Sequence, residues 1–380
     1  MELWHDRILV LDFGSQYTQL IARRIREAQV YSQILPCTVS LATVLAYRPK
    51  GIVLSGGPSS VYDKKAPKIP KQLFDQGIPI LGICYGMQLV THLQGGEVEK
   101  APHREFGRAE LQLDDRSDLF KGIGRGGSTV VWMSHGDRIE RMPPGFRSIA
   151  HTDNSPIAAM KRHDAKQRIY CLQFHPEVAH TAEGATILKN FVYDICGCKP
   201  TWTMRSYVDT AVEQIRQQVG TERVICALSG GVDSSVAAAL THRAVGDQLT
   251  CIFVDNGVLR AGEREQVEKT FASQLHLNMR ILDRTTQFMT ALKNVTDPER
   301  KRKIIGRLFI KNFEAESKKL KGIKYLVQGT LYPDVIESVS FKGPSATIKT
   351  HHNVGGLPTK MKLKLVEPLR ELFKDEVRVL

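Results

Sequence analysis

Apolar runs alternate with amphipathic stretches along the first part of the chain. Residues 7–11, 51–54 and 78–83 form short apolar runs, and a glycine-containing turn follows each of them. Such runs are typical of buried parallel strands, and the stretches between them are typical of helices. Closely spaced strand candidates follow at residues 129–174, and a helix candidate spans residues 182–195. The pattern therefore predicts an α/β domain.

A break in this pattern divides the chain near residue 200. Gly197 and Pro200 interrupt the helix candidate, and periodic sequence resumes at Met204. Glycine and proline are the strongest local interruptions of regular structure. We therefore predict two domains, residues 1–200 and residues 201–380.

The second part of the chain repeats the alternation of strands and helices. Residues 223–228, 249–254 and 324–327 are strand candidates, residues 298–324 form a basic helical stretch, and residues 338–365 have the composition of a loop. The predicted fold class is therefore α/β, with a mostly parallel twisted sheet flanked by helices in each domain. Ligand sites are expected beyond the carboxyl ends of the strands.

Composition supports a folded protein and excludes several classes. An apolar content of 42% is enough for sizeable cores in a chain of 380 residues. The 7 cysteines, close together only at Cys196 and Cys198, match neither a disulfide framework nor a zinc site of two CxxC pairs. No run reaches the roughly 20 apolar residues of a membrane span, and the first residues lack a signal-peptide pattern. We expect a cytoplasmic protein without a membrane partner.

The chain is basic, with 53 Lys and Arg residues against 40 Asp and Glu residues and a net charge of +13. A basic surface attracts phosphates, whether they belong to nucleotides or to nucleic acid. No arginine-rich tail, aromatic platform or zinc-finger spacing accompanies the charge. The charge therefore favours nucleic acid only weakly, and we expect no specific nucleic-acid partner.

Cys84 lies at a predicted sharp turn between a strand and a helix. Gly82 and Gly86 flank it, as small residues do in a nucleophile elbow, where they leave the side chain exposed at the apex. The N-terminus of the following helix would favour a thiolate. Taken alone, Cys84 is equally compatible with a buried structural thiol.

A second segment supplies a candidate base and a candidate acid. His175 and Glu177 follow the strand candidate 168–173. In that position His175 could take the thiol proton while Glu177 orients and charges the imidazole. A lone His-Pro-Glu sequence is otherwise an ordinary turn.

These two motifs, Gly-Ile-Cys-Tyr-Gly and Phe-His-Pro-Glu, together resemble the class I glutamine amidotransferases. The resemblance implies that Cys84 attacks the side-chain amide of glutamine, forms a glutamyl thioester and releases ammonia. Leu54–Pro58 resembles the oxyanion loop of that family, so the implied oxyanion donors are the N–H groups of Gly57 and Tyr85. Ser134–Asp137 resembles a family segment that helps to hold glutamine.

A turn rich in serine and glycine follows the strand candidate 223–228 and opens a helix. Amides and hydroxyls in such a turn can surround phosphate oxygens, and the helix dipole adds a favourable field. It is not a Walker A loop, because no Gly-Lys-Ser/Thr closes it, and an ordinary turn is the alternative. The predicted phosphate-binding residues are Ser229, Gly230, Gly231, Val232, Asp233, Ser234 and Ser235.

The sequence Ser-Gly-Gly-x-Asp-Ser resembles the signature of the ATP-pyrophosphatases, which cut ATP between its α- and β-phosphates. The resemblance implies that this turn binds ATP and that Asp233 holds Mg²⁺ together with phosphate oxygens. Val254 lies near the end of the next strand candidate, where the adenosine would bind. The Asn256-Gly257 pair that follows is also compatible with a simple turn.

The order of the two halves resembles the glutamine-hydrolysing GMP synthetase family. That resemblance implies that XMP, ATP and glutamine are converted to GMP, AMP, pyrophosphate and glutamate, with Arg302 at the XMP phosphate and residues 349–364 as a lid over the nucleotides. Four further segments that carry the resemblance are residues 12–17, 301–306, 328–334 and 351–358.

Members of this family continue into a C-terminal domain that forms a homodimer, and a chain of 380 residues is expected to lack it. Three alternatives stay open at this point. The first is a shortened form limited to glutaminase activity or ATP binding, the second is another amide-forming ligase, and the third is a non-catalytic regulatory variant.

Overall fold

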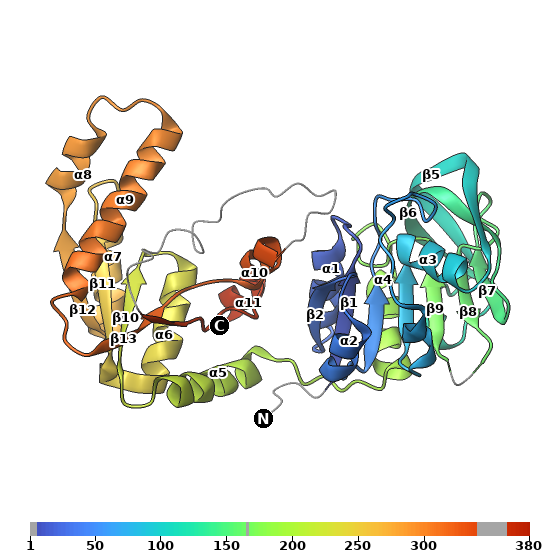
Figure 1. Cartoon of the computed structure of the whole chain (residues 1–380), viewed down its shortest axis with the longest axis horizontal. Coiled ribbons are helices and arrows are strands. Elements are labelled where there is room, and N and C mark those ends of the chain that lie inside the picture. Colours follow the sequence, from blue (N-terminus) through green and yellow to red (C-terminus); the bar gives the residue numbers. More distant parts are fainter. Residues whose placement is uncertain (1–5, 165–166, 340–362) are drawn as a thin grey trace. The chain divides into compact units, whose positions relative to one another are not determined.

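The computed structural model describes residues 6–164, 167–339 and 363–380. These residues form two compact units, one that ends at Thr203 and one that begins at Met204. Each unit has a sheet of its own with helices packed against it (Figure 1). The predicted two-domain α/β fold class is confirmed, but the sheet of the first unit is mixed and not mostly parallel as predicted.

The sheet of the first unit has nine strands in the order β2-β1-β3-β4-β9-β8-β7-β5-β6. The strands from β2 to β9 in this order run parallel, and those from β9 to β6 pair antiparallel. Short connections join the antiparallel strands, whereas parallel strands need helical crossovers. The nine strands are β1 (Arg7–Asp12), β2 (Tyr31–Pro36), β3 (Gly51–Leu54), β4 (Ile80–Ile83), β5 (Glu97–Leu113), β6 (Ser128–Arg141), β7 (Phe146–His151), β8 (Ala159–Arg162) and β9 (Ile169–Leu172).

The core of the first unit lies around its parallel strands. Every residue of β3, β4 and β9 is buried, which explains why these segments read as unbroken apolar runs. The predicted helix 182–195 begins at Gly184 and ends where Gly197 adopts a φ of 68°. The helices are α1 (Thr18–Glu27), α2 (Leu41–Tyr47), α3 (Tyr85–Leu93), α4 (Gly184–Lys189), a π-helix (Asn190–Ile195) and 3₁₀ turns (Lys71–Asp75 and Asp118–Phe120).

The second unit has a wholly parallel five-stranded sheet in the order β12-β11-β10-β13-β14. Its strands are β10 (Arg223–Leu228), β11 (Leu249–Asp255), β12 (Asn278–Asp283), β13 (Ile323–Val327) and β14 (Lys364–Val366). Its helices are α5 (Met204–Val219), α6 (Val232–Val245), α7 (Glu263–Val267), a π-helix (Glu268–Gln274), α8 (Thr285–Leu292), α9 (Pro298–Ser317), α10 (Tyr332–Val339), α11 (Lys374–Val379) and a 3₁₀ turn (Gly246–Gln248).

The basic stretch predicted at residues 298–324 forms helix α9. Asp297 caps this helix by accepting a hydrogen bond of 2.7 Å from the N–H of Arg300, and Pro298 occupies its first turn. The loop predicted at residues 338–365 lies mostly outside the described residues, and its last two residues belong to β14. In the part of the chain that the structure describes, no helix is long and apolar enough to cross a bilayer.

Candidate active sites

Cys84 occupies the turn between β4 and α3. Its backbone has φ 52° and ψ −106°, a conformation that costs energy for any residue other than glycine. A side chain at Gly86 would overlap the carbonyl oxygen of Leu54, and a Cβ at Gly82 would lie 2.9 Å from the backbone of Gly86. The two glycines therefore allow the sharp turn that places the Cys84 sulfur at the end of β4.

His175 and Glu177 follow β9, the strand beside β4. Cys84, His175 and Glu177 are 6%, 3% and 0% exposed, and His175 Nδ1 lies 2.7 Å from Glu177 Oε1. Burial opposes protonation of the His175 imidazole, but hydrogen bonds to Cys84 and Glu177 outweigh it and raise the pKa of His175 to about 10. The fold thus brings the three predicted catalytic side chains together.

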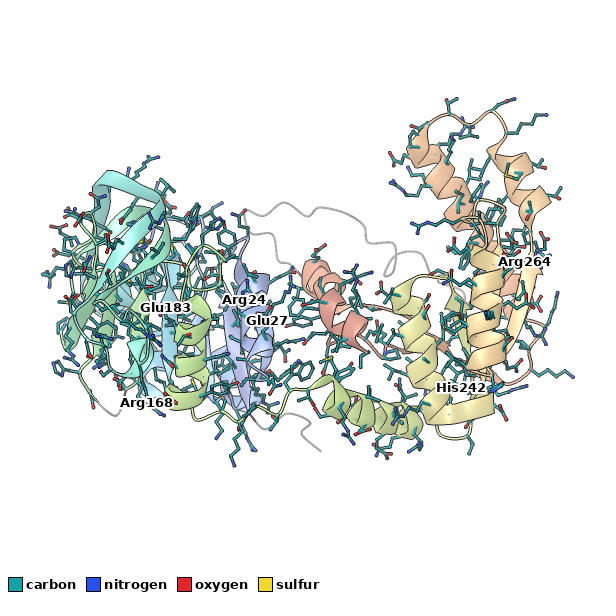
Figure 2. The ribbon with its side chains drawn as sticks, turned by 180° about the vertical axis from the view of Figure 1, so that it is seen from behind. Arg24, Glu27, Arg168, Glu183, His242 and Arg264 are labelled. Atoms are coloured by element: carbon teal, nitrogen blue, oxygen red, sulfur yellow. The ribbon has the colours of Figure 1, made fainter. Side chains whose placement is uncertain are left out.

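Backbone contacts hold this segment in place. The His175 N–H donates to the carbonyl of Trp132, and Thr181 Oγ1 donates to the His175 carbonyl. Arg24 on α1, which pairs with Glu27 on the same helix (Figure 2), donates from Nε to the Glu177 carbonyl at 3.0 Å. The imidazole therefore has a fixed position relative to the sheet.

The predicted oxyanion donors lie next to these side chains. A Cβ at Gly56 would be 3.2 Å from His175 Cε1, and one at Gly57 would be 3.4 Å from the Tyr85 ring. Among the described residues, the N–H groups of Gly57 and Tyr85 donate no hydrogen bond. Two unused N–H groups close to a nucleophile are what an oxyanion requires.

A cavity of about 500 Å³ opens beside Cys84 and His175, a size typical of small-ligand sites. The Cys84 sulfur lies 3.7 Å from the Ser134 carbonyl oxygen at its wall. The remaining lining residues are Gly14, Ser15, Gln16, Tyr17, Gly57, Pro58, Ser59, Ser60, Gln88, Phe106, His135, Gly136 and Asp137.

Several of these residues were not singled out by the sequence. Gln88 is one helical turn after Cys84, so helix periodicity could have placed it on the same face. Its Nε2 donates to the Asp137 carbonyl at 3.0 Å. Phe106 comes from the middle of the long strand β5 and is 64% exposed. No local signal connects Phe106 to a site whose nucleophile is on another strand.

In the second unit, the predicted phosphate-binding turn joins β10 to α6. Ser229 Oγ and Ser234 Oγ lie 3.0 Å apart, and Ser235 Oγ donates to the Gly231 carbonyl at 2.8 Å. Gly230 has a φ of 76°, a conformation that favours glycine. Helix α6 begins at Val232, so the last four of the predicted phosphate-binding residues lie in its first turn. The hydroxyls and the helix N-terminus thus lie in a single turn.

Asp233 in the first turn of α6 faces a lysine. Its Oδ2 lies 2.7 Å from Nζ of Lys374 on α11, and its Oδ1 is buried without a hydrogen-bond partner among the described residues. A buried carboxylate oxygen with an unused acceptor fits a cation that takes its remaining ligands from phosphate. Within the described ranges, no cluster of three or more His, Cys, Asp or Glu side chains could bind a metal by itself.

The other predicted nucleotide contacts are more scattered. Val254 is the penultimate residue of β11, and its side chain belongs to the hydrophobic core of the second unit. It could therefore meet a ligand only through its backbone. Arg302 is exposed on α9, and residues 349–362 of the predicted lid lie outside the described residues. The nucleotide roles of Arg302 and the lid stay predictions.

Comparison with known proteins covers both halves of the chain. A family model for class-I glutamine amidotransferases matches residues 9–195, and one for NAD synthase matches residues 204–317. The GMP synthase [glutamine-hydrolyzing] of Solidesulfovibrio magneticus is 57% identical over 374 residues, which are 98% of this chain and 72% of that protein. The protein of the same name from Wolinella succinogenes is 56% identical over 382 residues, with 99% and 73% covered. The resemblance inferred from the motifs is confirmed.

Proposed function

The chain belongs to the glutamine-hydrolysing GMP synthase family, and from this we propose that it makes GMP from XMP, ATP and glutamine. Glutamine would be hydrolysed in the first unit, and XMP would be activated by ATP in the second. The products are GMP, AMP, pyrophosphate and glutamate. The observation that carries the glutaminase part is the buried contact of Cys84 and Glu177 with the same imidazole.

In the first step, the Cys84 sulfur attacks the side-chain amide carbon of glutamine. A protonated imidazole beside a cysteine is the arrangement in which catalytic cysteines react as thiolates. The unused N–H groups of Gly57 and Tyr85 stabilise the negative oxygen of the tetrahedral intermediate. His175 then gives its proton to the departing nitrogen, the C–N bond breaks, and ammonia leaves a glutamyl thioester on Cys84.

Water completes the cycle. His175, now neutral, takes a proton from a water molecule that attacks the thioester carbon. The C–S bond breaks, glutamate leaves, and the sulfur and imidazole return to their starting state. Glu177 keeps the imidazole oriented and stabilises its cationic form throughout.

In the second unit, the turn at residues 229–235 binds the phosphates of ATP through backbone N–H groups and serine hydroxyls. Asp233 would hold Mg²⁺ through the carboxylate oxygen that has no hydrogen-bond partner among the described residues. When bound, Mg²⁺ would supply positive charge that offsets the negative charge of the phosphates. An oxygen of XMP attacks the α-phosphate, and ammonia then displaces AMP from the adenylated intermediate.

The test measures GMP formation by the full chain with glutamine and, separately, with ammonium as nitrogen donor. In Cys84→Ala we expect the glutamine-driven reaction to fall at least about 10³-fold, the scale of losing a covalent nucleophile, while the ammonium-driven reaction continues. In Asp233→Asn both reactions should fall together. Glutamine-driven synthesis that survives in Cys84→Ala would refute the assigned nucleophile.

Three further expectations from the sequence belong to this proposal. Membership of this family supports the expectation that the binding partners of the chain are small-molecule substrates. A cytoplasmic location and the absence of a specific nucleic-acid partner stay predictions.

A further inference from the structure

A buried carboxylate lies behind the residues that line the cavity beside Cys84. Glu105 on β5 is 8% exposed. Its Oε1 accepts from Thr152 Oγ1 at 3.0 Å, and its Oε2 accepts from Ser155 Oγ at 2.8 Å and faces His135 Nε2 at 3.2 Å. Burial disfavours the charged form, but the hydrogen bonds from His135, Ser155 and Thr152 outweigh it and lower the pKa of Glu105 below its ordinary value. Glu105 is thus an ionised carboxylate that is held in place by its contacts with Thr152, Ser155 and His135.

His135 connects this carboxylate to the cavity wall. It lies directly opposite Glu105 in the register of β5 and β6. Its Nε2 faces Glu105, and its Nδ1 lies 3.0 Å from the carbonyl oxygen of Asp137. Both oxygens are hydrogen-bond acceptors, so each ring nitrogen of His135 faces an acceptor. Glu105 and the Asp137 carbonyl therefore set the ring orientation together.

The wall itself lies between this anchor and the nucleophile. Ser134–Asp137 lines the cavity. The Asp137 carbonyl also accepts from Gln88 Nε2 on α3, the helix that begins directly after Cys84. The Ser134 carbonyl oxygen lies 3.7 Å from the Cys84 sulfur. A shift of His135 would therefore move the backbone that a substrate beside Cys84 must contact.

We propose that Glu105 is a positioning residue of the glutaminase site. Hydrogen bonds from Thr152 and Ser155 fix the carboxylate of Glu105, which in turn orients the His135 ring. The orientation of His135 then positions the segment Ser134–Asp137, which lines the cavity where glutamine would bind. This inference rests on the proposed glutaminase function and adds to it a residue that has no contact with the reacting atoms.

The test substitutes Glu105→Gln in the full chain and measures glutamate release as a function of glutamine concentration. The amide keeps the size of the side chain but removes its charge, so the His135 ring loses a charge-assisted hydrogen bond. We expect KM for glutamine to rise about tenfold, the scale of one such bond. kcat should stay within about threefold, because Cys84, His175 and Glu177 are unchanged. Ammonium-driven GMP formation should not change.

The matched control is Glu110→Gln, the same change at an exposed position on the same strand, and it should leave KM unchanged. A double-mutant cycle with His135→Asn separates positioning from general packing. If Glu105 acts through His135, adding Glu105→Gln to His135→Asn should raise KM no further. Should Glu105→Gln fail to fold, Ser155→Ala removes one bond to the same carboxylate and should raise KM by a smaller factor.

Three results would overturn the proposal. They are an unchanged KM in Glu105→Gln, effects that add fully in the double mutant, and an equal loss of ammonium-driven synthesis. Failure of the proposed function would look different, because the unmodified chain would then release no glutamate or Cys84→Ala would still release it.

Discussion

Burial makes most of the cysteines in this protein unreactive. It raises the pKa of Cys37 to about 11 and the pKa of Cys198 to about 12, so both are thiols at neutral pH. Cys84 is equally hidden from solvent, but it precedes a helix and contacts the imidazole of His175. In the proposed mechanism, the helix N-terminus and the His175 imidazole distinguish Cys84 from the structural cysteines.

The interaction of Glu177 with His175 has a predictable pH dependence. The pKa of His175 rises from 6.5 to about 10 on folding, so protonated His175 stabilises the fold fully below pH 6.5, and this stability is lost as the pH rises through 10. Glu177→Gln removes the charge that supports the imidazolium. We expect its melting temperature to lie below that of the unmodified chain at pH 7 and the gap to close near pH 10, measured by calorimetry.

The same variant should reduce kcat for glutamine hydrolysis by about 10²-fold or more, since the general base loses its orienting partner. Ammonium-driven GMP formation gives the control. A melting gap that stays constant from pH 7 to pH 10 would show that the carboxylate acts through packing and not through the charge of His175.

At the scale of elements, the geometry of the β4 to α3 turn depends on close backbone contacts. Gly82 lies against Gly86, and Gly86 lies against Leu54 at the end of β3. Neither position has room for a methyl group. The turn therefore holds Cys84 in its strained conformation only while α3 stays close to two neighbouring strands.

Gly86→Ala should accordingly disturb the elbow. We expect the free energy of unfolding of the first unit to fall by about 2 kcal/mol or more, since the contact is with rigid backbone, and glutamine hydrolysis to be lost. Gly126→Ala is the control, because nothing lies within 4 Å of the added carbon. Denaturant unfolding followed together with glutamate release would measure both effects, and normal activity in Gly86→Ala would contradict this view of the turn.

At the scale of the whole molecule, the two units carry different chemistry. The first brings together a cysteine, a histidine and a carboxylate with no need for a metal in its proposed mechanism. The second places Asp233 and Lys374 beside a turn of serine hydroxyls and amides. The proposed Mg²⁺ would draw most of its ligands from ATP, because Asp233 supplies only a carboxylate.

Metal removal should therefore separate the two activities. With EDTA present, we expect pyrophosphate release from ATP and XMP to stop, while glutamate release measured without nucleotides stays at its original rate. Excess Mg²⁺ should restore pyrophosphate release. If EDTA also abolished glutamine hydrolysis measured without nucleotides, the proposal that only the second unit needs a metal would be wrong.

The sequence by itself determined the features that depend on contiguous residues. The apolar runs predicted β1, β3, β4, β9, β10 and β11. The sequence also predicted three local features: the elbow around Cys84, the His175-Glu177 pair and the turn at residues 229–235. Each of them depends only on a short stretch of chain with particular backbone freedom or side-chain chemistry.

Only the tertiary structure decided what comes from distant residues. Glu105 reaches His135, Thr152 and Ser155 through strand pairing and a loop, and Lys374 reaches Asp233 across 141 positions. The sequence predicted closely spaced strands at residues 129–174, but it predicted neither β5 nor the antiparallel pairing and order of these strands. Pairing and register depend on which surfaces are buried against each other, and this is a property of the assembled core and not of any single segment.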